Sequence, residues 1–164
     1  GNAYQLYRSG SNAKFGIFKS GSFSSVAGTS TINDGNWHHI MGVNTGADIK
    51  IYVDGALENT SAGGGGTIAN GTEDFRIGRR GGTSAQRGFF TGTIDEVAVW
   101  NSDQSANAST IYNSGVPNDI SSLSPLSWWR CGDADTAPTL TDNGSASNDG
   151  TMTNFSTFST DVPT

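Results

Sequence analysis

Apolar and polar residues alternate in short stretches near the start of the chain, and turn-forming residues separate the stretches. Tyr4–Arg8 and Lys14–Lys19 both alternate, and the residues between them are rich in Ser, Gly and Asn. Alternation with a period of two places every second side chain on the same face of a strand. The two stretches therefore predict an antiparallel hairpin, which a weaker strand over Phe23–Ala27 follows.

The clearest hairpin signal lies further along the chain. Trp37–Val43 and Ile49–Val53 predict two strands, and Asp54-Gly55 predicts a tight turn into another strand that begins at Ala56. Asp-Gly is favoured in such a turn because a type I′ turn needs a positive φ at both central residues. We expect these strands to be antiparallel neighbours.

The rest of the chain predicts more short strands and one short helix. The strands cover Asp74–Gly78, Phe89–Trp100, Trp128–Cys131 and Gly150–Asn154, and the run from Gly63 to Gly66 predicts a flexible surface loop. The helix is expected over Ala106–Asn113, with Ser105 as its N-cap and Gly115 just past its end. This pattern predicts an all-β fold, an antiparallel two-sheet β-sandwich with one short helix.

The same alternation predicts which apolar side chains are buried. We expect most of the core among Phe15, Ile17, Trp37, Ile51, Val53, Ile77, Ile94, Val97, Val99, Trp100 and Ile111.

Composition agrees with this fold class and excludes several functions. Of the 164 residues, 34% are hydrophobic and 15% are charged, and the 23 glycines disfavour long helices because each costs a helix about 1 kcal/mol. A transmembrane helix needs about 18 consecutive apolar residues, and no apolar run of this sequence approaches that length. Membrane insertion is therefore not expected. The net charge of −6 repels phosphate backbones, so nucleic acid is not expected as a partner.

Five segments, in this order, carry a resemblance to a known family. They are Asp34–Ile40, Ile51–Gly55, Arg76–Gly78, Gly92–Trp100 and Ile111–Gly115. With them the chain resembles the laminin-G-like group of concanavalin A-like lectin/glucanase sandwiches. The resemblance implies a jelly-roll sandwich over residues 1–120, and we expect its opening strands to be missing from this chain.

Residues 121–164 carry a resemblance of their own. Trp129-Arg130, Asp142-Asn143-Gly144 and Asp161-Val162-Pro163 are similar to the C-terminal tails of large marine bacteriophage virion proteins that contain such sandwiches. A lone hairpin is marginally stable in water, and an open sheet edge readily pairs with another strand. We therefore expect a strand of this tail to pack on an edge of the sandwich, in this chain or in a neighbouring copy.

The resemblance to glucanases makes carboxylates the first candidates for catalysis. An active relative is expected to carry a Glu-x-Asp-x-(x)-Glu run on one face of a strand, whereas this chain has only Asp95 and Glu96 there. Adjacent residues of a strand point to opposite faces, so we expect no hydrolase activity. By the same argument His38 and His39 would not bind one metal together, and one of them is expected inside and the other outside.

Calcium is the metal that the sequence leaves open. Asp133, Asp135, Asp142 and Asp149 crowd one loop region, and oxygen ligands in loops suit Ca²⁺, which related lectin sandwiches often hold. The alternative interpretation is that these aspartates only form turns.

The first candidate for ligand binding is a group of arginines. Arg79, Arg80 and Arg87 form a basic cluster that suits an anionic glycan or another subunit. The alternative is a solvated loop whose arginines pair with nearby acids such as Glu73 and Asp74.

Trp128 is a candidate for stacking on a sugar ring. Trp128 and Trp129 are expected to point to opposite faces of a strand, which leaves at most one of them in the core.

The resemblance favours a non-enzymatic module on the surface of a virion, in a fibre or decoration protein. Its expected task is adhesion to glycan or to the host surface, in an oligomer with other virion subunits. Two alternatives stay open: a glycan-binding module of a secreted or cell-surface bacterial protein, and a structural sandwich that binds no sugar.

Overall fold

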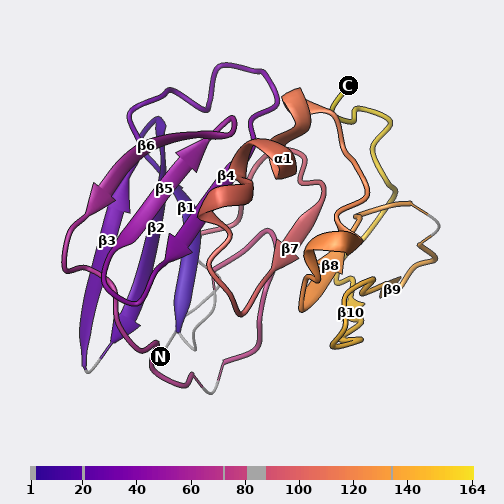
Figure 1. The fold of residues 1–164 in the computed structure, drawn as a ribbon. Helices are drawn as coiled ribbons and strands as arrows, with labels where there is room; N and C mark the ends of the chain where they lie inside the picture. Colours follow the sequence, from indigo (N-terminus) through magenta and orange to yellow (C-terminus); the bar gives the residue numbers. More distant parts are fainter. Residues whose placement is uncertain (1–2, 20, 72, 81–87, 134) are drawn as a thin grey trace. The chain divides into compact units, whose positions relative to one another are not determined.

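The computed structural model describes residues 3–19, 21–71, 73–80, 88–133 and 135–164. Most of its regular structure consists of strands in small, separate antiparallel sheets, and it contains one short α-helix (Figure 1). The predicted all-β fold class is therefore confirmed. The chain divides into unit 1, Gly1–Phe90 with Asp103–Gly115, and unit 2, Thr91–Ser102 with Val116–Thr164.

The first sheet of unit 1 contains the hairpin predicted at the start of the chain. β1 (Tyr4–Ser9), β2 (Asn12–Lys19) and β3 (Ser22–Ala27) are antiparallel, with β2 in the centre. Gly10 turns the chain between β1 and β2 with a φ of 63°, a conformation that favours glycine. Both predicted strands and the weaker third one are confirmed.

The second sheet of unit 1 is built around the Asp-Gly turn. β4 (Ile40–Asn44), β5 (Ile49–Val53) and β6 (Ala56–Ser61) are antiparallel, with β5 in the centre. Asp54 and Gly55 have φ values of 50° and 76°, as a type I′ turn requires. The prediction placed the start of β4 too early, because Trp37–His39 lie outside the strand.

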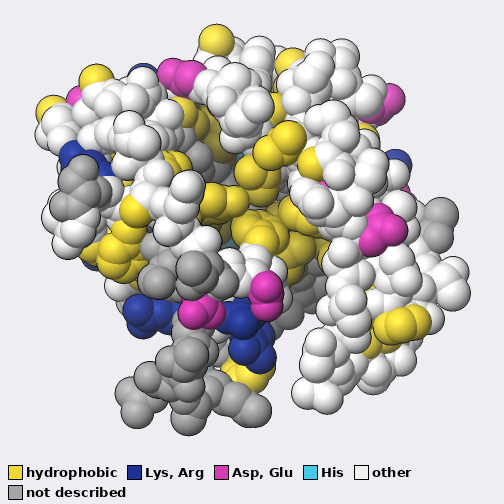
Figure 2. Space-filling model, turned by 90° about the horizontal axis from the view of Figure 1, so that it is seen from below, with side chains coloured by type: hydrophobic (Ala, Val, Ile, Leu, Met, Phe, Trp, Pro, Cys, Tyr) yellow, Lys and Arg dark blue, Asp and Glu magenta, His cyan; other side chains and the backbone are white. Residues whose placement is uncertain are grey.

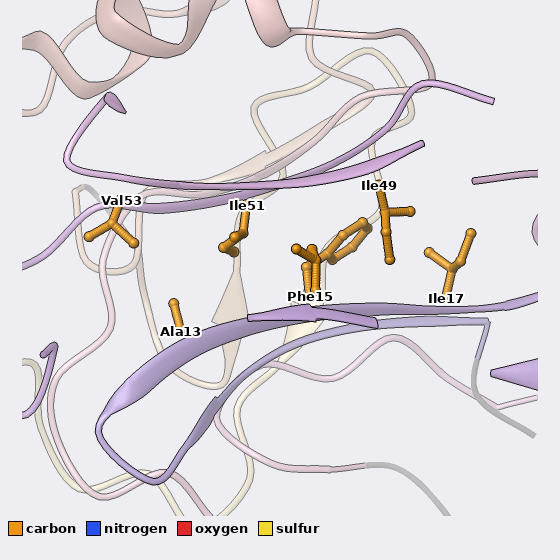
Figure 3. Packing of buried hydrophobic residues seen from close by; sticks show 7 residues of the cluster. Ala13, Phe15, Ile17, Ile49, Ile51 and Val53 are labelled. Carbon is orange, nitrogen blue, oxygen red and sulfur yellow. The ribbon is translucent and has the colours of Figure 1, made fainter. Parts of the chain in front are cut away.

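The main hydrophobic core of unit 1 lies between these two sheets. Side chains of β2 and of β5 point toward one another there (Figure 3). The buried cluster consists of Ala13, Phe15, Ile17, Val26, Ile49, Ile51 and Val53. Two sheets that bury their facing side chains against each other form the two layers of a sandwich.

The other face of the second sheet is covered by the helical segment. Met41, Val43 and Tyr52 are buried there with Ala108 of the helix α1 (Ala108–Tyr112), and Ile111 is partly buried against them. Strand alternation thus sends β5 side chains into two different clusters.

The helical segment differs from its prediction in length and in capping. α1 has only five residues, and 3₁₀ turns over Ser105–Asn107 and Asn113–Gly115 flank it. The cap expected from Ser105 is wrong: Gln104 and Asn107, the residues before the first 3₁₀ turn and before α1, make no side-chain cap. α1 ends at Asn113, which takes the left-handed conformation with a φ of 45°.

The glycine run, predicted as a flexible surface loop, is a loop, but its surface position is wrong for two of the four glycines. Gly64 and Gly65 are buried, and the amide of Gly65 donates to the carbonyl oxygen of Ala47 at 2.9 Å. The ammonium of Lys19 donates to the carbonyls of Gly63 and Gly65 at 2.9 and 2.6 Å. The lack of side chains lets this segment approach the backbone between β4 and β5.

The described residues of unit 2 contain two short pairs of strands. β7 (Val97–Val99) pairs with β8 (Ser127–Trp129), and β9 (Thr139–Leu140) pairs with β10 (Gly150–Thr151), all antiparallel. A 3₁₀ turn covers Ser121–Leu123. The segment around Trp128 therefore pairs with another strand of this chain.

Several predicted strands are shorter than expected or absent. The strand over Phe89–Trp100 reduces to β7, because Glu96 just before it has a φ of 51°. Asp74–Gly78 forms no strand, and Arg79 makes an isolated bridge with Phe89. Within the described residues, no helix has the length and apolar character that crossing a membrane requires.

The core prediction is confirmed only for four residues of β2 and β5 in unit 1. Phe15, Ile17, Ile51 and Val53 are buried. The remaining predicted residues are only partly buried: Trp37, Ile77, Ile94, Val97, Val99, Trp100 and Ile111. Most of these lie on short or irregular segments, where alternation does not decide burial.

Candidate functional site

The candidate arginines lie beside exposed aromatic rings in unit 1. The guanidinium carbon of Arg79 lies 6.0 Å from the ring centroid of Phe89, and the amide of Arg80 donates to the carbonyl of Gly88 at 3.2 Å. Phe89 and Phe90 are 58% and 48% exposed. We call Arg79, Arg80, Phe89 and Phe90 the basic–aromatic surface. Arg87 lies outside the described residues.

The acids expected beside this cluster bind another arginine. Glu73 and Asp74 form ion pairs with Arg76 at 3.4 and 3.6 Å. On the face shown in Figure 2, most of the surface is uncharged, and Lys and Arg side chains gather in one region near acidic ones. Arg79 and Arg80 themselves are exposed.

Trp128 is buried in unit 2, contrary to the expectation of an exposed stacking ring. Its relative exposure is 4%, and that of Trp129 is 6%, so the expectation that at most one of them is in the core is wrong. The Nε1 of Trp129 donates to the carbonyl of Asn148 at 3.1 Å. The prediction from strand alternation failed here because other segments cover both faces of β8, and all three of its residues are buried. Trp128 thus presents little surface for a sugar.

The two acids considered for catalysis have structural contacts of their own. Asp95 accepts a hydrogen bond from the amide of Glu96 at 3.0 Å. Glu96 accepts from Trp128 Nε1 at 2.6 Å and from Arg130 Nε at 3.2 Å. Burial raises the pKa of both carboxyls. Neither acid lies in a strand, so the argument from opposite strand faces does not describe their geometry.

The first two calcium candidates bind separate partners. Asp133 forms an ion pair with Arg130 at 2.7 Å. Asp135 accepts hydrogen bonds from the amides of Gly132 at 3.0 Å and Thr141 at 2.8 Å. These contacts hold the loop that enters β9.

Asp142 organises the following loop. Its carboxylate is buried and accepts hydrogen bonds from the amides of Trp128, Gly144 and Asn148 at 2.7–2.8 Å. Burial raises the pKa of Asp142, but these bonds outweigh burial and lower it overall. Asp149 accepts from the amide of Asp142 at 2.9 Å.

These contacts do not fit a calcium site. In the described part of the chain, no group of three or more His, Cys, Asp or Glu side chains could hold a metal ion. The carboxylates of Asp135, Asp142 and Asp149 instead accept hydrogen bonds from backbone amides, as the alternative interpretation of turn-forming aspartates implies, and that of Asp133 pairs with Arg130.

His38 lies between two carboxylates in unit 1, a cluster that the sequence analysis missed. Its Nδ1 is 2.9 Å from Asp54 Oδ2, and its Nε2 is 3.1 Å from Asp34 Oδ1. Asp54 also accepts from the amide of His39 at 2.9 Å. Two ionised carboxylates require a proton on both ring nitrogens, so this geometry favours the imidazolium form. The sequence signal for this cluster was Asp54, the aspartate of the predicted hairpin turn.

The two histidines have opposite electrostatic environments. Burial alone would lower the pKa of His38, but the hydrogen bonds to Asp54 and Asp34 outweigh it and raise the pKa. Burial lowers the pKa of His39, whose ring centroid lies 6.0 Å from that of Tyr112. Hydrogen bonds from Asn36 and then from His38 lower the pKa of Asp34 to about 2.

Comparison with known proteins assigns the family. Residues 1–111 match the family described as the concanavalin A-like lectin/glucanases superfamily. The chain belongs to this superfamily. The match covers the two sheets of unit 1 and β7, and it ends inside α1. The basic–aromatic surface thus lies within the lectin/glucanase match, whereas Trp128 and the four aspartates lie beyond it.

Individual relatives of this lectin/glucanase chain are larger proteins. It is 30% identical over 108 residues to the mouse and rat sushi, von Willebrand factor type A, EGF and pentraxin domain-containing protein 1. The similarity covers 60% of this chain and 3% of each relative. A solved S-layer domain-containing protein of Clostridium thermocellum aligns with a TM-score of 0.42 and 17% identity, over 67% of this chain and 63% of that one.

Proposed function

We propose that the chain is a non-enzymatic adhesion module that binds an anionic glycan through the basic–aromatic surface. The observation that carries the proposal is the exposed guanidinium of Arg79 beside the ring of Phe89, with Arg80 next in the chain. Guanidinium groups pair with carboxylate and sulfate oxygens, and aromatic rings pack against the apolar faces of sugars. Membership of a superfamily named for lectins supports a binding role.

The carboxylates support binding over hydrolysis. A glycoside hydrolase needs two carboxyl groups that flank one scissile bond. Glu96 uses both carboxylate oxygens for Trp128 and Arg130, and Asp95 bonds to the amide of Glu96. Incubation with β-glucan should therefore release no reducing sugar, and the double variant D95N/E96Q should behave as the wild type. Release that the double variant abolishes would overturn the non-enzymatic role.

A glycan array tests the proposed ligand class. We expect the wild-type chain to bind sulfated or uronic-acid glycans, and R79A and R80A to lose this binding. R8A is the matched control, because Arg8 is another exposed arginine of unit 1. We expect the calcium chelator EGTA to leave this binding unchanged. Binding only to neutral glycans, or equal binding by R79A, R80A and R8A, would contradict the proposal.

We further propose that the module is displayed on a virion, in an oligomer with other virion subunits. The support is the similarity of residues 121–164 to phage virion tails. An antibody against the chain should label purified virions of the phage that encodes it. Its detection only in the soluble secreted fraction or on bacterial cells would favour the alternative of an extracellular glycan-binding module. That alternative gains support from relatives that are themselves multidomain proteins, of which this chain spans 3%.

A further inference from the structure

Unit 2 contains a hollow of about 400 Å³ to which the proposed glycan binding gives no role. Its apolar lining consists of Ile94, Leu140, Met152, Phe155, Phe158 and Val162. Sites for small molecules are commonly about 300–1,000 Å³ and mostly apolar, with a few polar groups that orient the ligand. The hollow therefore has the size and lining of a small-molecule site.

Two phenylalanines give this hollow an aromatic wall. The ring centroids of Phe155 and Phe158 lie 4.6 Å apart, with an angle of 56° between the rings. Gly132 lies against Phe158, where an added Cβ would be 3.3 Å from the ring. The lining thus includes aromatic rings, whose π faces attract cations.

The charged groups that line the hollow are acidic. Asp95 and Asp161 contribute carboxylates, and no Lys, Arg or His is among the described residues of the lining. Burial raises the pKa of Cys131, the thiol in the lining, to about 11, so it stays neutral at pH 7. Arg130 is the cation nearby, and it is bound to Glu96 and Asp133.

A carboxylate in partly apolar surroundings gains most from a cationic partner. Burial is the largest influence on the pKa of Asp95 and raises it, and the hydrogen bond from the Glu96 amide and the charge of Arg130 offset only part of this effect, so the ionised form lacks full compensation. A ligand cation would supply this compensation. A ligand anion would add repulsion from both Asp95 and Asp161.

We propose that this hollow binds a small organic cation, a primary ammonium carried on an apolar body. The ammonium pairs with Asp95 and Asp161, and the apolar body lies against Phe155 and Phe158. The proposal goes beyond the glycan-binding function, because it uses residues of unit 2 whereas the basic–aromatic surface belongs to unit 1.

Three probes of similar shape and different charge test the proposal at pH 7. 2-Phenylethylammonium, 2-phenylethanol and 3-phenylpropionate are titrated into the full chain while backbone amide shifts are recorded by NMR. We expect the ammonium to shift residues of the lining and to bind about tenfold more tightly than the alcohol, a difference of about 1.4 kcal/mol. The carboxylate should not bind. Equal binding of the three probes, or no shift in the lining with the ammonium, overturns the proposal.

Variants identify the groups that select the charge. D95N and D161N should each weaken binding of the ammonium about tenfold and leave binding of the alcohol unchanged. D119N is the matched control, since Asp119 is an acid of unit 2 outside the lining. Asp95 also accepts a hydrogen bond from the amide of Glu96, so D95N can affect folding. If D95N fails to fold, D161N decides the outcome. Wild-type affinity in folded D161N, or an equal loss in D119N, contradicts the assignment.

Discussion

Trp128 Nε1 donates a 2.6 Å hydrogen bond to Glu96 Oε2. The other carboxylate oxygen accepts from Arg130, whose guanidinium carbon lies 5.2 Å from the centroid of the Trp128 ring. Glu96 directly precedes β7, and Trp128 lies in β8. A single carboxylate therefore connects the residue before β7 to Trp128 in β8 and to Arg130 just after β8.

The variant E96A tests this connection. It removes the acceptor of the buried Trp128 indole and should lower the free energy of unfolding by about 1–3 kcal/mol. E96Q is the matched comparison, because its amide oxygen still accepts the indole proton while the charge for Arg130 is lost. Urea unfolding measures both. E96A as stable as the wild type would show that the contact contributes nothing.

Ile51 lies in the centre of the core of unit 1, at 0% exposure. I51A should lower the free energy of unfolding by about 2–5 kcal/mol, because it leaves a cavity between two packed sheets. Leu57 on the neighbouring β6 is 51% exposed, so L57A should change stability by no more than about 0.5 kcal/mol. Equal melting temperatures of I51A and L57A would mean that the core lies elsewhere.

The opposite pKa shifts of two adjacent histidines predict a stability maximum near pH 6.5. The folded-state pKa of His38 is raised above its ordinary value of 6.5, so its contribution is complete below pH 6.5 and is lost as the pH rises through the folded-state pKa. The pKa of His39 is lowered, so its contribution is present above pH 6.5 and is lost as the pH falls toward the folded-state pKa.

Each histidine variant should remove one side of this maximum. H38Q should flatten the decline of unfolding free energy above pH 6.5, and H39Q should flatten the decline below it. Chemical denaturation between about pH 5 and pH 8 measures both slopes. If H38Q leaves the alkaline slope unchanged, the two aspartates do not hold a protonated His38.

The close approach of the glycine loop predicts that G65A is destabilising. An added Cβ would lie 2.5 Å from backbone atoms of Ala47 and Asp48, which cannot move without displacing the chain before β5. Overpacking of this kind costs about 1–3 kcal/mol. G150A is the control, because its Cβ would meet Leu140 at 3.4 Å, an ordinary contact. A melting temperature of G65A equal to that of G150A would contradict the close approach.

Deletion of residues 126–164 tests whether the tail supports the rest of the chain. The truncation removes β8 and leaves β7 with an unpaired edge, so we expect aggregation or a much lower melting temperature. Light scattering and thermal melts measure the outcome. A monomeric truncated chain with an unchanged melting curve would make the tail an independent arm.

Local chemistry made the two three-stranded sheets of unit 1 predictable from the sequence. The turn at Asp54 and Gly55 follows from two residues that tolerate a positive φ, and strand alternation placed Ile17 and Ile51 in the core. The same rules failed at Glu96 and Cys131, which also have a positive φ, because no local pattern indicates that either residue ends a strand.

The candidate site was only partly predictable for a related reason. Arg79 and Arg80 are exposed as expected of a basic loop, but the aromatic partner Phe89 comes from a segment that was predicted as a strand. The cluster around His38 was missed because it joins Asp34, in a loop, to Asp54, in a turn beyond two strands. Sequence spacing does not show which distant carboxylates meet.

The chain passes between its two units after Phe90, after Ser102 and after Gly115. Recombination at the first boundary would separate the sheets of unit 1 from the helix that covers them, and at the third it would separate β7 from β8. At the second boundary, both losses would occur together. Recombination at any of these boundaries therefore separates parts that pack together. We expect the two interleaved units to be inherited together rather than exchanged singly between genes.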